Sequence, residues 1–130
     1  MATCFSAWKQ SFLEGQNYSY NLTELGRYYC DYTRFMALFD RVLPGRVLTV
    51  RYEDLVTDTE AQVRRLLDHC GLPFELACLS HHETTRPVRT ASSEQVRQPM
   101  YRDGLDQWRR FQPWLGDLRS ALATVLDDDA

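Results

Sequence analysis

Apolar side chains recur at helical spacing from the first residues of the chain. Phe5, Trp8 and Phe12 are three and four positions apart, which predicts an amphipathic helix. A longer helix is expected over residues 21–43, where apolar and aromatic residues return every three or four positions. Asn21, with a glutamate three positions later, is a good N-terminal cap for this helix. Its tyrosines are expected to pack in the core.

A different pattern follows the second helix. Residues 46–50, with the sequence RVLTV, are short, apolar and β-branched, as in a buried strand of a parallel sheet. Thr57 and Glu60 form a capping box for another helix, which Gly71 is expected to end. The order helix, strand, helix is typical of an α/β unit.

The apolar periodicity then disappears. Residues 84–101 are polar, with two prolines and many hydroxyl groups. An irregular stretch of this length in a compact domain is usually functional or disordered. Helical spacing returns after it, and the chain ends in an acidic tail, residues 127–130.

Composition and charge exclude several classes of protein. The chain has 130 residues, of which 44% are hydrophobic, so one globular domain with its own core is expected. Its net charge of -3 provides no basic field for nucleic acid or a membrane surface. The sequence has no stretch apolar enough to cross a bilayer and no secretory signal pattern. We therefore expect a cytoplasmic protein with neither a nucleic-acid nor a membrane partner.

Neither a metal site nor a catalytic residue is predicted. The four cysteines have no metal-ligand or redox spacing, and reduced thiols are the expected state. His81 and His82 follow Cys78, but the segment CLSHH matches no zinc motif. No Ser-His-Asp arrangement can be inferred from the sequence.

Tyr52 stands just beyond the end of the predicted strand. In open α/β sheets, ligands bind beyond the carboxyl ends of the strands. A tyrosine there can stack on a planar ring or form a hydrogen bond with its edge. The alternative is that Tyr52 only covers the edge of the sheet, and position alone leaves both interpretations open.

The polar stretch is the second candidate site. It carries Arg86, Arg89 and Arg97 against the single acid Glu94, so it is locally cationic in an acidic protein. Arginine side chains, hydroxyls and main-chain amides are the groups that bind phosphate. The alternative interpretation is a solvated surface loop.

Four segments together resemble the C-terminal half of the sulfotransferases that use 3′-phosphoadenosine 5′-phosphosulfate. They are TCFSAWKQ, LPGRVLTVRYEDLV, RRLLDHCGLPFE and TASSEQVRQPMY followed by a tryptophan, and the resemblance covers about Thr3 to Leu126. The likeness is strongest to bacterial sulfotransferases that often carry tetratricopeptide repeats, whose relatives include the tyrosylprotein sulfotransferases. The order and spacing of the segments are more specific than any one of them.

The resemblance implies an α/β fold, a P-loop-like sandwich around a parallel sheet. Residues 1–130 would be a single partial domain, the C-terminal half of the sulfotransferase domain, mostly helical with one or two strands of that sheet. The glycine-rich loop for the 5′-phosphosulfate and the general base of the family are absent from this sequence. We therefore expect that the missing N-terminal half of the same protein is a partner of this chain. The 130 residues alone are expected to be inactive.

The resemblance also assigns a nucleotide site. Tyr52 matches the tyrosine that contacts the adenine of the cofactor, and Ser6 matches a serine that binds its 3′-phosphate. Residues 84–101 match the loop that covers the cofactor. The candidate contacts in this loop are Ser92, Ser93, Gln95, Val96 and Arg97. The product, adenosine 3′,5′-bisphosphate, would occupy the same site.

One position departs from the family pattern. Gln107 stands where tyrosylprotein sulfotransferases have a lysine, directly before the tryptophan that is Trp108 here. Arg102 or Arg109 is a candidate substitute for that phosphate contact.

The function implied for the full-length protein is transfer of a sulfuryl group to a hydroxyl or amine acceptor, with a general base that deprotonates the acceptor. A peptide tyrosine, a carbohydrate hydroxyl and a small phenol all stay open as acceptors. The alternative function is a non-catalytic nucleotide-binding or protein-interaction module derived from the same fold.

Overall fold

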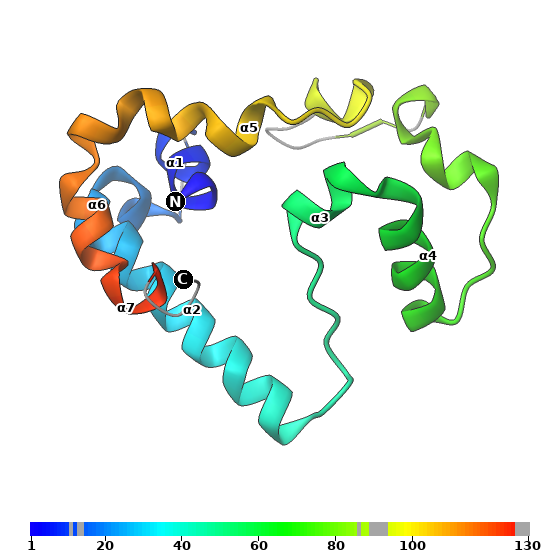
Figure 1. The fold of residues 1–130 in the computed structure, drawn as a ribbon, viewed down its shortest axis with the longest axis horizontal. Helices are drawn as coiled ribbons and strands as arrows, with labels where there is room; N and C mark the ends of the chain where they lie inside the picture. The colour runs from blue at the N-terminus through cyan, green and yellow to red at the C-terminus, as the bar shows by residue number, and fades with distance from the viewer. Residues whose placement is uncertain (11, 13–14, 86, 89–93, 127–130) are drawn as a thin grey trace. The chain divides into compact units, whose positions relative to one another are not determined.

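The computed structural model describes residues 1–10, 12, 15–85, 87–88 and 94–126 (Figure 1). Over these residues the chain alternates between helices and irregular segments. The α-helices are α1 (Ala2–Lys9), α2 (Leu22–Val42), α3 (Tyr52–Thr57), α4 (Thr59–Cys70), α5 (Asp103–Asp106), α6 (Gly116–Ala121) and α7 (Ala123–Leu126). The 3-10 helices are η1 (Asn17–Tyr20), η2 (Leu76–Leu79), η3 (His81–Glu83), η4 (Gln95–Arg97) and η5 (Gln107–Trp114).

The prediction of an α/β fold with one or two strands of a parallel sheet is wrong. Residues 46–47 are bends and residues 48–50 have no regular secondary structure, and no residue within the described ranges belongs to a strand. A strand exists only through hydrogen bonds to a neighbouring strand. No strand within the described residues pairs with RVLTV, so its β-branched composition does not produce a sheet there.

The chain divides into two compact units, which we describe separately. Unit 1 consists of Met1–Val47 and Asp103–Ala130, and unit 2 consists of Leu48–Arg102. None of the helices in the described ranges has the length and apolar character that crossing a bilayer requires.

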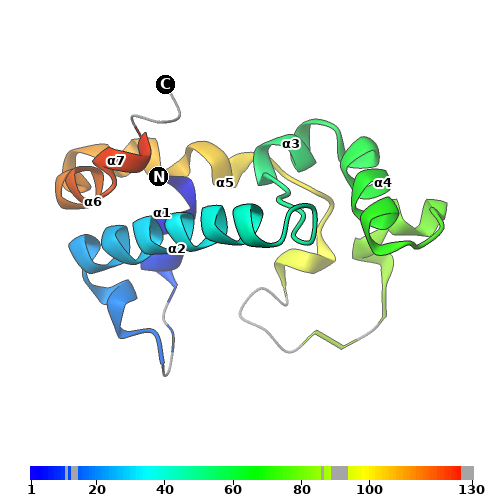
Figure 2. The same ribbon diagram turned by 90° about the horizontal axis from the view of Figure 1, so that it is seen from below.

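Unit 1 contains the hydrophobic core. The helix α6 packs on α2, and α1 packs on both α2 and η5; Figure 2 shows α6 and α7 alongside the first turns of α2. The buried apolar side chains of this core are Cys4, Phe5, Leu25, Cys30, Leu115, Leu118 and Leu122. Segments from both ends of the sequence therefore close one core.

The long helix α2 begins and ends where the sequence predicts. The Asn21 side chain accepts hydrogen bonds from the main-chain nitrogens of Thr23 and Glu24, at 2.9 and 3.0 Å, which confirms the cap. The helix ends at Val42, before Pro44. Only its first half contributes fully buried side chains, and most large apolar side chains of its second half are exposed. They include Tyr32, Phe35, Leu38 and Val42.

Unit 2 is built differently, because none of its described residues is fully buried. The helices α3 and α4 follow one another with Asp58 between them, and the Asp58 side chain accepts a hydrogen bond from the main-chain nitrogen of Ala61. The predicted capping box is thus wrong by one residue, since the Thr57 hydroxyl donates back to the carbonyl of Glu53 instead.

The end of α4 matches the prediction. Gly71 has a positive φ of 67°, and the main-chain nitrogens of Gly71 and Leu72 donate to the carbonyls of Asp68 and Leu67. This pair of hydrogen bonds closes the helix in a Schellman motif, which favours glycine at that position. Beyond it, Phe74 lies 3.6 Å from the guanidinium carbon of Arg64.

Candidate functional site

Tyr52 is the first residue of α3, directly after Arg51, whose backbone is extended. Its phenol donates a hydrogen bond of 2.8 Å to the main-chain oxygen of Tyr101, while 40% of its surface stays exposed. Partial burial, and then the neighbouring Tyr101 phenol, raise the pKa of Tyr52 above its usual value. The hydroxyl is therefore neutral and held in place, and part of the ring faces solvent.

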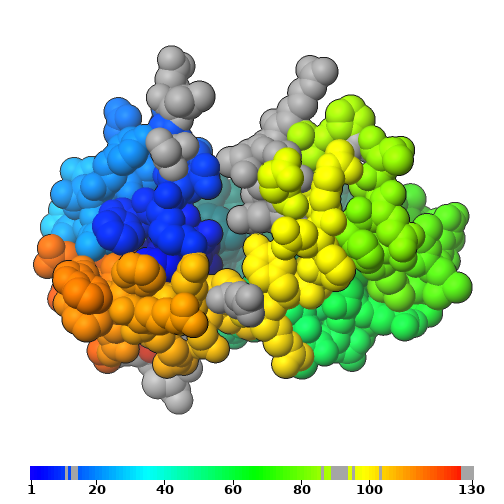
Figure 3. Space-filling model, turned by 90° about the horizontal axis from the view of Figure 1, so that it is seen from above, coloured from blue at the N-terminus to red at the C-terminus, as the bar shows by residue number. Residues whose placement is uncertain are grey.

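A second hydrogen bond holds the other end of α3. The Arg102 guanidinium donates to the carbonyl oxygen of Val56 at 3.4 Å, the long end of the hydrogen-bond range. Tyr52 and Val56 are four positions apart, so they share one face of the helix. Two adjacent residues, Tyr101 and Arg102, thus contact both ends of α3, and Figure 3 shows their segment (yellow) lying against the green surface of α3.

Hydrogen bonds from side chains also hold the described part of the polar stretch 84–101 in place. The Arg97 guanidinium donates to the carbonyl oxygen of Thr84 at 2.8 Å, and Thr84 ends η3. Val96 is partly buried, and Gln95 begins η4. Ser92 and Ser93 lie outside the described residues. One hydrogen bond, from Arg97 to Thr84, therefore joins two described parts of the stretch, and another, from Tyr52 to Tyr101, joins it to α3.

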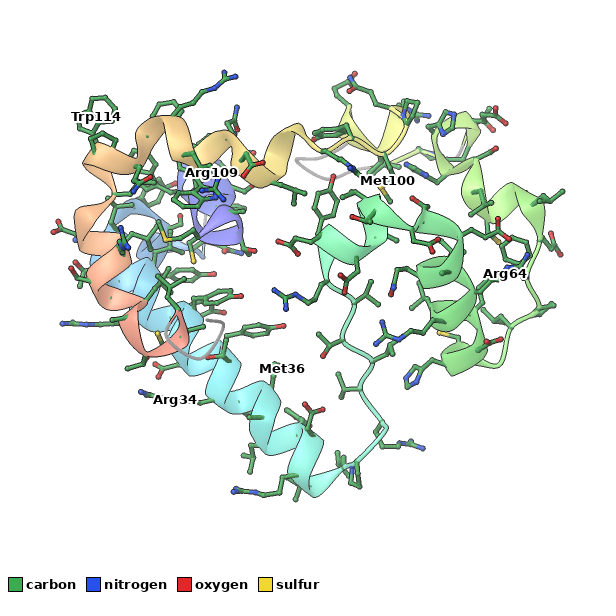
Figure 4. The ribbon with its side chains drawn as sticks, in the orientation of Figure 1. Arg34, Met36, Arg64, Met100, Arg109 and Trp114 are labelled. Atoms are coloured by element: carbon green, nitrogen blue, oxygen red, sulfur yellow. The ribbon has the colours of Figure 1, made fainter. Side chains whose placement is uncertain are left out.

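A shallow pocket of about 280 Å³ lies in unit 2, between the start of α4 and the residues just before Tyr101. Its lining consists of Thr59, Glu60, Leu79, His81, His82, Pro99 and Met100, the last labelled in Figure 4. The Nδ1 atom of His82, a lining residue, is buried without a hydrogen-bond partner in the described residues. No sequence pattern marks this pocket, because its lining comes from three separated segments.

No metal centre is seen in the part of the chain that the structure describes. Its histidines, cysteines, aspartates and glutamates form no cluster of three that could hold a metal ion. His81 and His82 face each other edge to face, with ring centroids 5.5 Å apart.

Ser6 lies in unit 1, on the exposed side of α1. Its neighbours Cys4 and Phe5 turn into the core, which fixes the helix and leaves Ser6 facing outward. One turn later, the Lys9 ammonium donates a hydrogen bond to the side-chain oxygen of Gln107. This sequence departs from the family pattern at Gln107. A lysine from another helix, Lys9, lies against this position.

The two arginines predicted to substitute at this position are engaged with other groups. Arg109 pairs with Asp106 at 2.6 Å and lies 5.0 Å from the centroid of the Trp108 ring. Arg102 donates to Val56 in unit 2. Sequence reasoning missed the main-chain carbonyl of Tyr101 as the anchor of Tyr52, because no side-chain pattern marks a carbonyl.

The nucleotide residues predicted from the sequence therefore fall into both units. Unit 2 brings Tyr52 close to the end of the polar stretch, whereas Ser6 belongs to unit 1. The described residues contain no strand whose edge Tyr52 covers.

Comparison with known proteins identifies the family. A profile described as "Sulfotransferase family" matches residues 1–76, which is more than half of the chain and includes both Ser6 and Tyr52. The chain belongs to the sulfotransferase family. Sulfuryl transfer is accordingly the general reaction of the family to which this chain belongs.

One curated relative is an "Uncharacterized protein" of Aquifex aeolicus (strain VF5). It is 34% identical to this chain over 98 residues, which cover 75% of the chain and 13% of the relative. The chain thus spans about an eighth of the length of this relative. No solved structure matches the chain.

Proposed function

We propose that this chain contributes the adenine side of a sulfotransferase nucleotide site, for 3′-phosphoadenosine 5′-phosphosulfate and its product. The observation that carries the proposal is the state of Tyr52. Its hydroxyl is fixed to the Tyr101 carbonyl, whereas 40% of the residue's surface is exposed. A tyrosine that is held in place and partly exposed suits stacking on a planar base.

The polar stretch supports the same proposal. Arg97 gives the described part of the stretch a positive charge, and its guanidinium donates to the Thr84 carbonyl. Val96 and Gln95 adjoin it in η4. That Ser92 and Ser93 contact the cofactor, and that residues 84–101 cover it as a loop, stay predictions from the family resemblance.

Ser6 is proposed to bind the 3′-phosphate. It is exposed on a helix whose other face is core, as a binding serine must be. Replacing Ser6 by Ala should weaken adenosine 3′,5′-bisphosphate more than adenosine 5′-monophosphate, because only the former carries the second phosphate. Equal losses for the two nucleotides would contradict this role.

The chain is not proposed to carry out catalysis alone. The sequence contains no glycine-rich phosphate loop, and no general base is assigned among its residues. In the complete reaction such groups would activate the acceptor and neutralise the leaving phosphate. We expect no transfer of sulfuryl groups from the cofactor to a phenol by the 130 residues, and detectable transfer would overturn this expectation.

Titration calorimetry of adenosine 3′,5′-bisphosphate into the chain tests the proposal. Replacing Tyr52 by Ala should weaken binding by about 1–3 kcal/mol, the scale of one lost base stack. Tyr20→Ala is a matched control, since Tyr20 is 58% exposed and its phenol also donates to a main-chain carbonyl, that of Phe12. Circular dichroism should show both variants folded. No binding by the unmodified chain would refute the proposal.

The alternative is a non-catalytic nucleotide-binding or protein-interaction module. The exposed apolar side chains on the second half of α2 favour keeping it, because such surfaces often contact another protein. An interaction module should be monomeric or form a defined oligomer, whereas a part of an enzyme with this surface uncovered should aggregate. Light scattering after size-exclusion chromatography distinguishes these outcomes.

A further inference from the structure

One lysine occurs among the fifteen basic residues of the chain, and it lies one helical turn beyond Ser6. Lys9 is the last residue of α1. Residues three positions apart on a helix are neighbours on its surface. Both residues are exposed, so they belong to the same solvent-facing surface of α1.

Lys9 is held by two uncharged partners. Its ammonium group donates a hydrogen bond to the side-chain oxygen of Gln107 in η5, 98 positions away in sequence. The same group lies 5.2 Å from the centroid of the Phe5 ring, which is buried in the core. A flexible side chain is thereby given a defined position between α1 and η5.

No carboxylate neutralises Lys9 among the residues that the structure describes. The ion pairs found there all involve arginines, and the one nearest in sequence to Gln107 joins Arg109 to Asp106. A lysine ammonium has three donor hydrogens, of which Gln107 accepts one. Two donors and a full positive charge therefore remain for a ligand.

We propose that Lys9 and Ser6 together form a binding site for a phosphate-type oxyanion, which is the 3′-phosphate of the nucleotide. The proposal rests on the function proposed above and adds the cation that Ser6 alone does not supply. The Ser6 hydroxyl donates one hydrogen bond, and the Lys9 ammonium adds charge-assisted hydrogen bonds, which are about twice as strong as neutral ones. Gln107 and Phe5 position the Lys9 ammonium without neutralising it.

The test compares two nucleotides and one charge relocation. Lys9→Met should weaken adenosine 3′,5′-bisphosphate about tenfold, the scale of a lost hydrogen bond to a charged group, and leave adenosine 5′-monophosphate unchanged. Because the Lys9 ammonium touches the Gln107 side chain, a lysine at position 107 can place its charge in the same region. Adding Gln107→Lys to Lys9→Met should therefore restore most of the affinity. Arg110→Met, which removes another exposed cation of η5, is the control and should leave the preference between the nucleotides unchanged.

The outcomes separate the two proposals. No bisphosphate binding by the unmodified chain removes the proposed function, and this inference with it. Binding that Lys9→Met leaves unaltered, or weakens equally for both nucleotides, overturns the Lys9 inference alone. If a variant fails to fold, a measurement on the unmodified chain tests the proposal instead. Since Lys9 is the single lysine, bisphosphate but not monophosphate should protect it from acylation, as read by peptide mass spectrometry, and equal acylation with both would contradict the proposal.

Discussion

Gly26 of α2 and Ala121 of α6 approach so closely that a Cβ atom at position 26 would lie 2.5 Å from the Cβ of Ala121. The same atom would lie 3.4 Å from the nearest side-chain carbon of Leu118, which is fully buried. No flexible side-chain end is available to move away on the Ala121 side. The contact between these two helices, which closes the core of unit 1, therefore depends on the absence of a side chain at Gly26.

Gly26→Ala should destabilise the protein, although alanine favours a helix over glycine. The gain in helix propensity is about 1 kcal/mol, and overpacking a core costs about 1–3 kcal/mol, so we expect a net loss of about 1 kcal/mol in the free energy of unfolding. Urea denaturation followed by circular dichroism measures it.

Two further variants test the reason for this loss. Adding Ala121→Gly to Gly26→Ala should recover most of the stability, because it removes the Ala121 methyl group that the new Cβ at position 26 would contact. Gly116→Ala, at the first residue of α6, should be neutral or stabilising, since a Cβ there meets nothing within 4 Å. A stabilising Gly26→Ala would show that the two helices do not pack as described.

Tyr52→Phe tests whether the hydroxyl positions the ring. The variant keeps the aromatic face and removes the hydrogen bond to the Tyr101 carbonyl. The net value of one hydrogen bond predicts a loss of about three- to tenfold in affinity for adenosine 3′,5′-bisphosphate.

Tyr101→Phe is the matched control for this hydrogen bond. It also deletes one phenol oxygen, but it leaves the main-chain acceptor in place, so the affinity should not change.

Replacing Arg102 by Met should add little to the effect of Tyr52→Phe on affinity, because both variants release α3 from the same two-residue segment. If the affinity losses of Tyr52→Phe and Arg102→Met add fully in the double variant, the two contacts act independently.

Alkaline pH should destabilise the fold through Cys4. Burial raises the pKa of its thiol from 9.0 to about 11, so the folded state retains a proton that the unfolded state loses first. The stabilisation is complete below pH 9 and is lost as the pH rises from 9 to about 11. The loss is on the order of 2 kcal/mol, and urea titrations at several pH values measure it.

Cys4→Ala isolates this effect from the tyrosines, which ionise in the same range. The variant should lose less stability than the unmodified protein between pH 9 and 11, whatever its stability at pH 7. Thiol reactivity gives an independent check at pH 8, where the exposed Cys70 should react with a disulfide reagent before the buried Cys4 and Cys30. Fast modification of Cys4 in the native protein would contradict its burial.

The helix boundaries were predictable where local chemistry decides them. Asn21 caps α2, and Gly71 closes α4, because each satisfies main-chain groups of its own helix. The cap of α4 was misplaced by one residue, since threonine and aspartate both compete for that position and Asp58 binds the helix amide. Residues 46–50 were mistaken for a strand because β-branched composition describes a residue preference and says nothing about a pairing partner.

The candidate site shows the same division. Tyr52 and Ser6 are candidates because of their likeness to family motifs, and the family match covers both positions. The contacts that hold Tyr52 were not found, because Tyr101 and Arg102 act on main-chain oxygens 49 and 46 positions away. The Lys9–Gln107 contact was also missed, since it joins α1 to η5 and no periodicity reports such long-range pairs.

Photolabelling with 8-azidoadenosine 3′,5′-bisphosphate tests the central claim most directly. Trypsin cleaves after Arg51 and Arg64, so residues 52–64 form one peptide that contains Tyr52. Our account predicts that this peptide carries the label, that excess unlabelled bisphosphate prevents it, and that Tyr52→Ala greatly reduces it. Competable labelling confined to other peptides, and unaffected by Tyr52→Ala, would show that the adenine binds elsewhere.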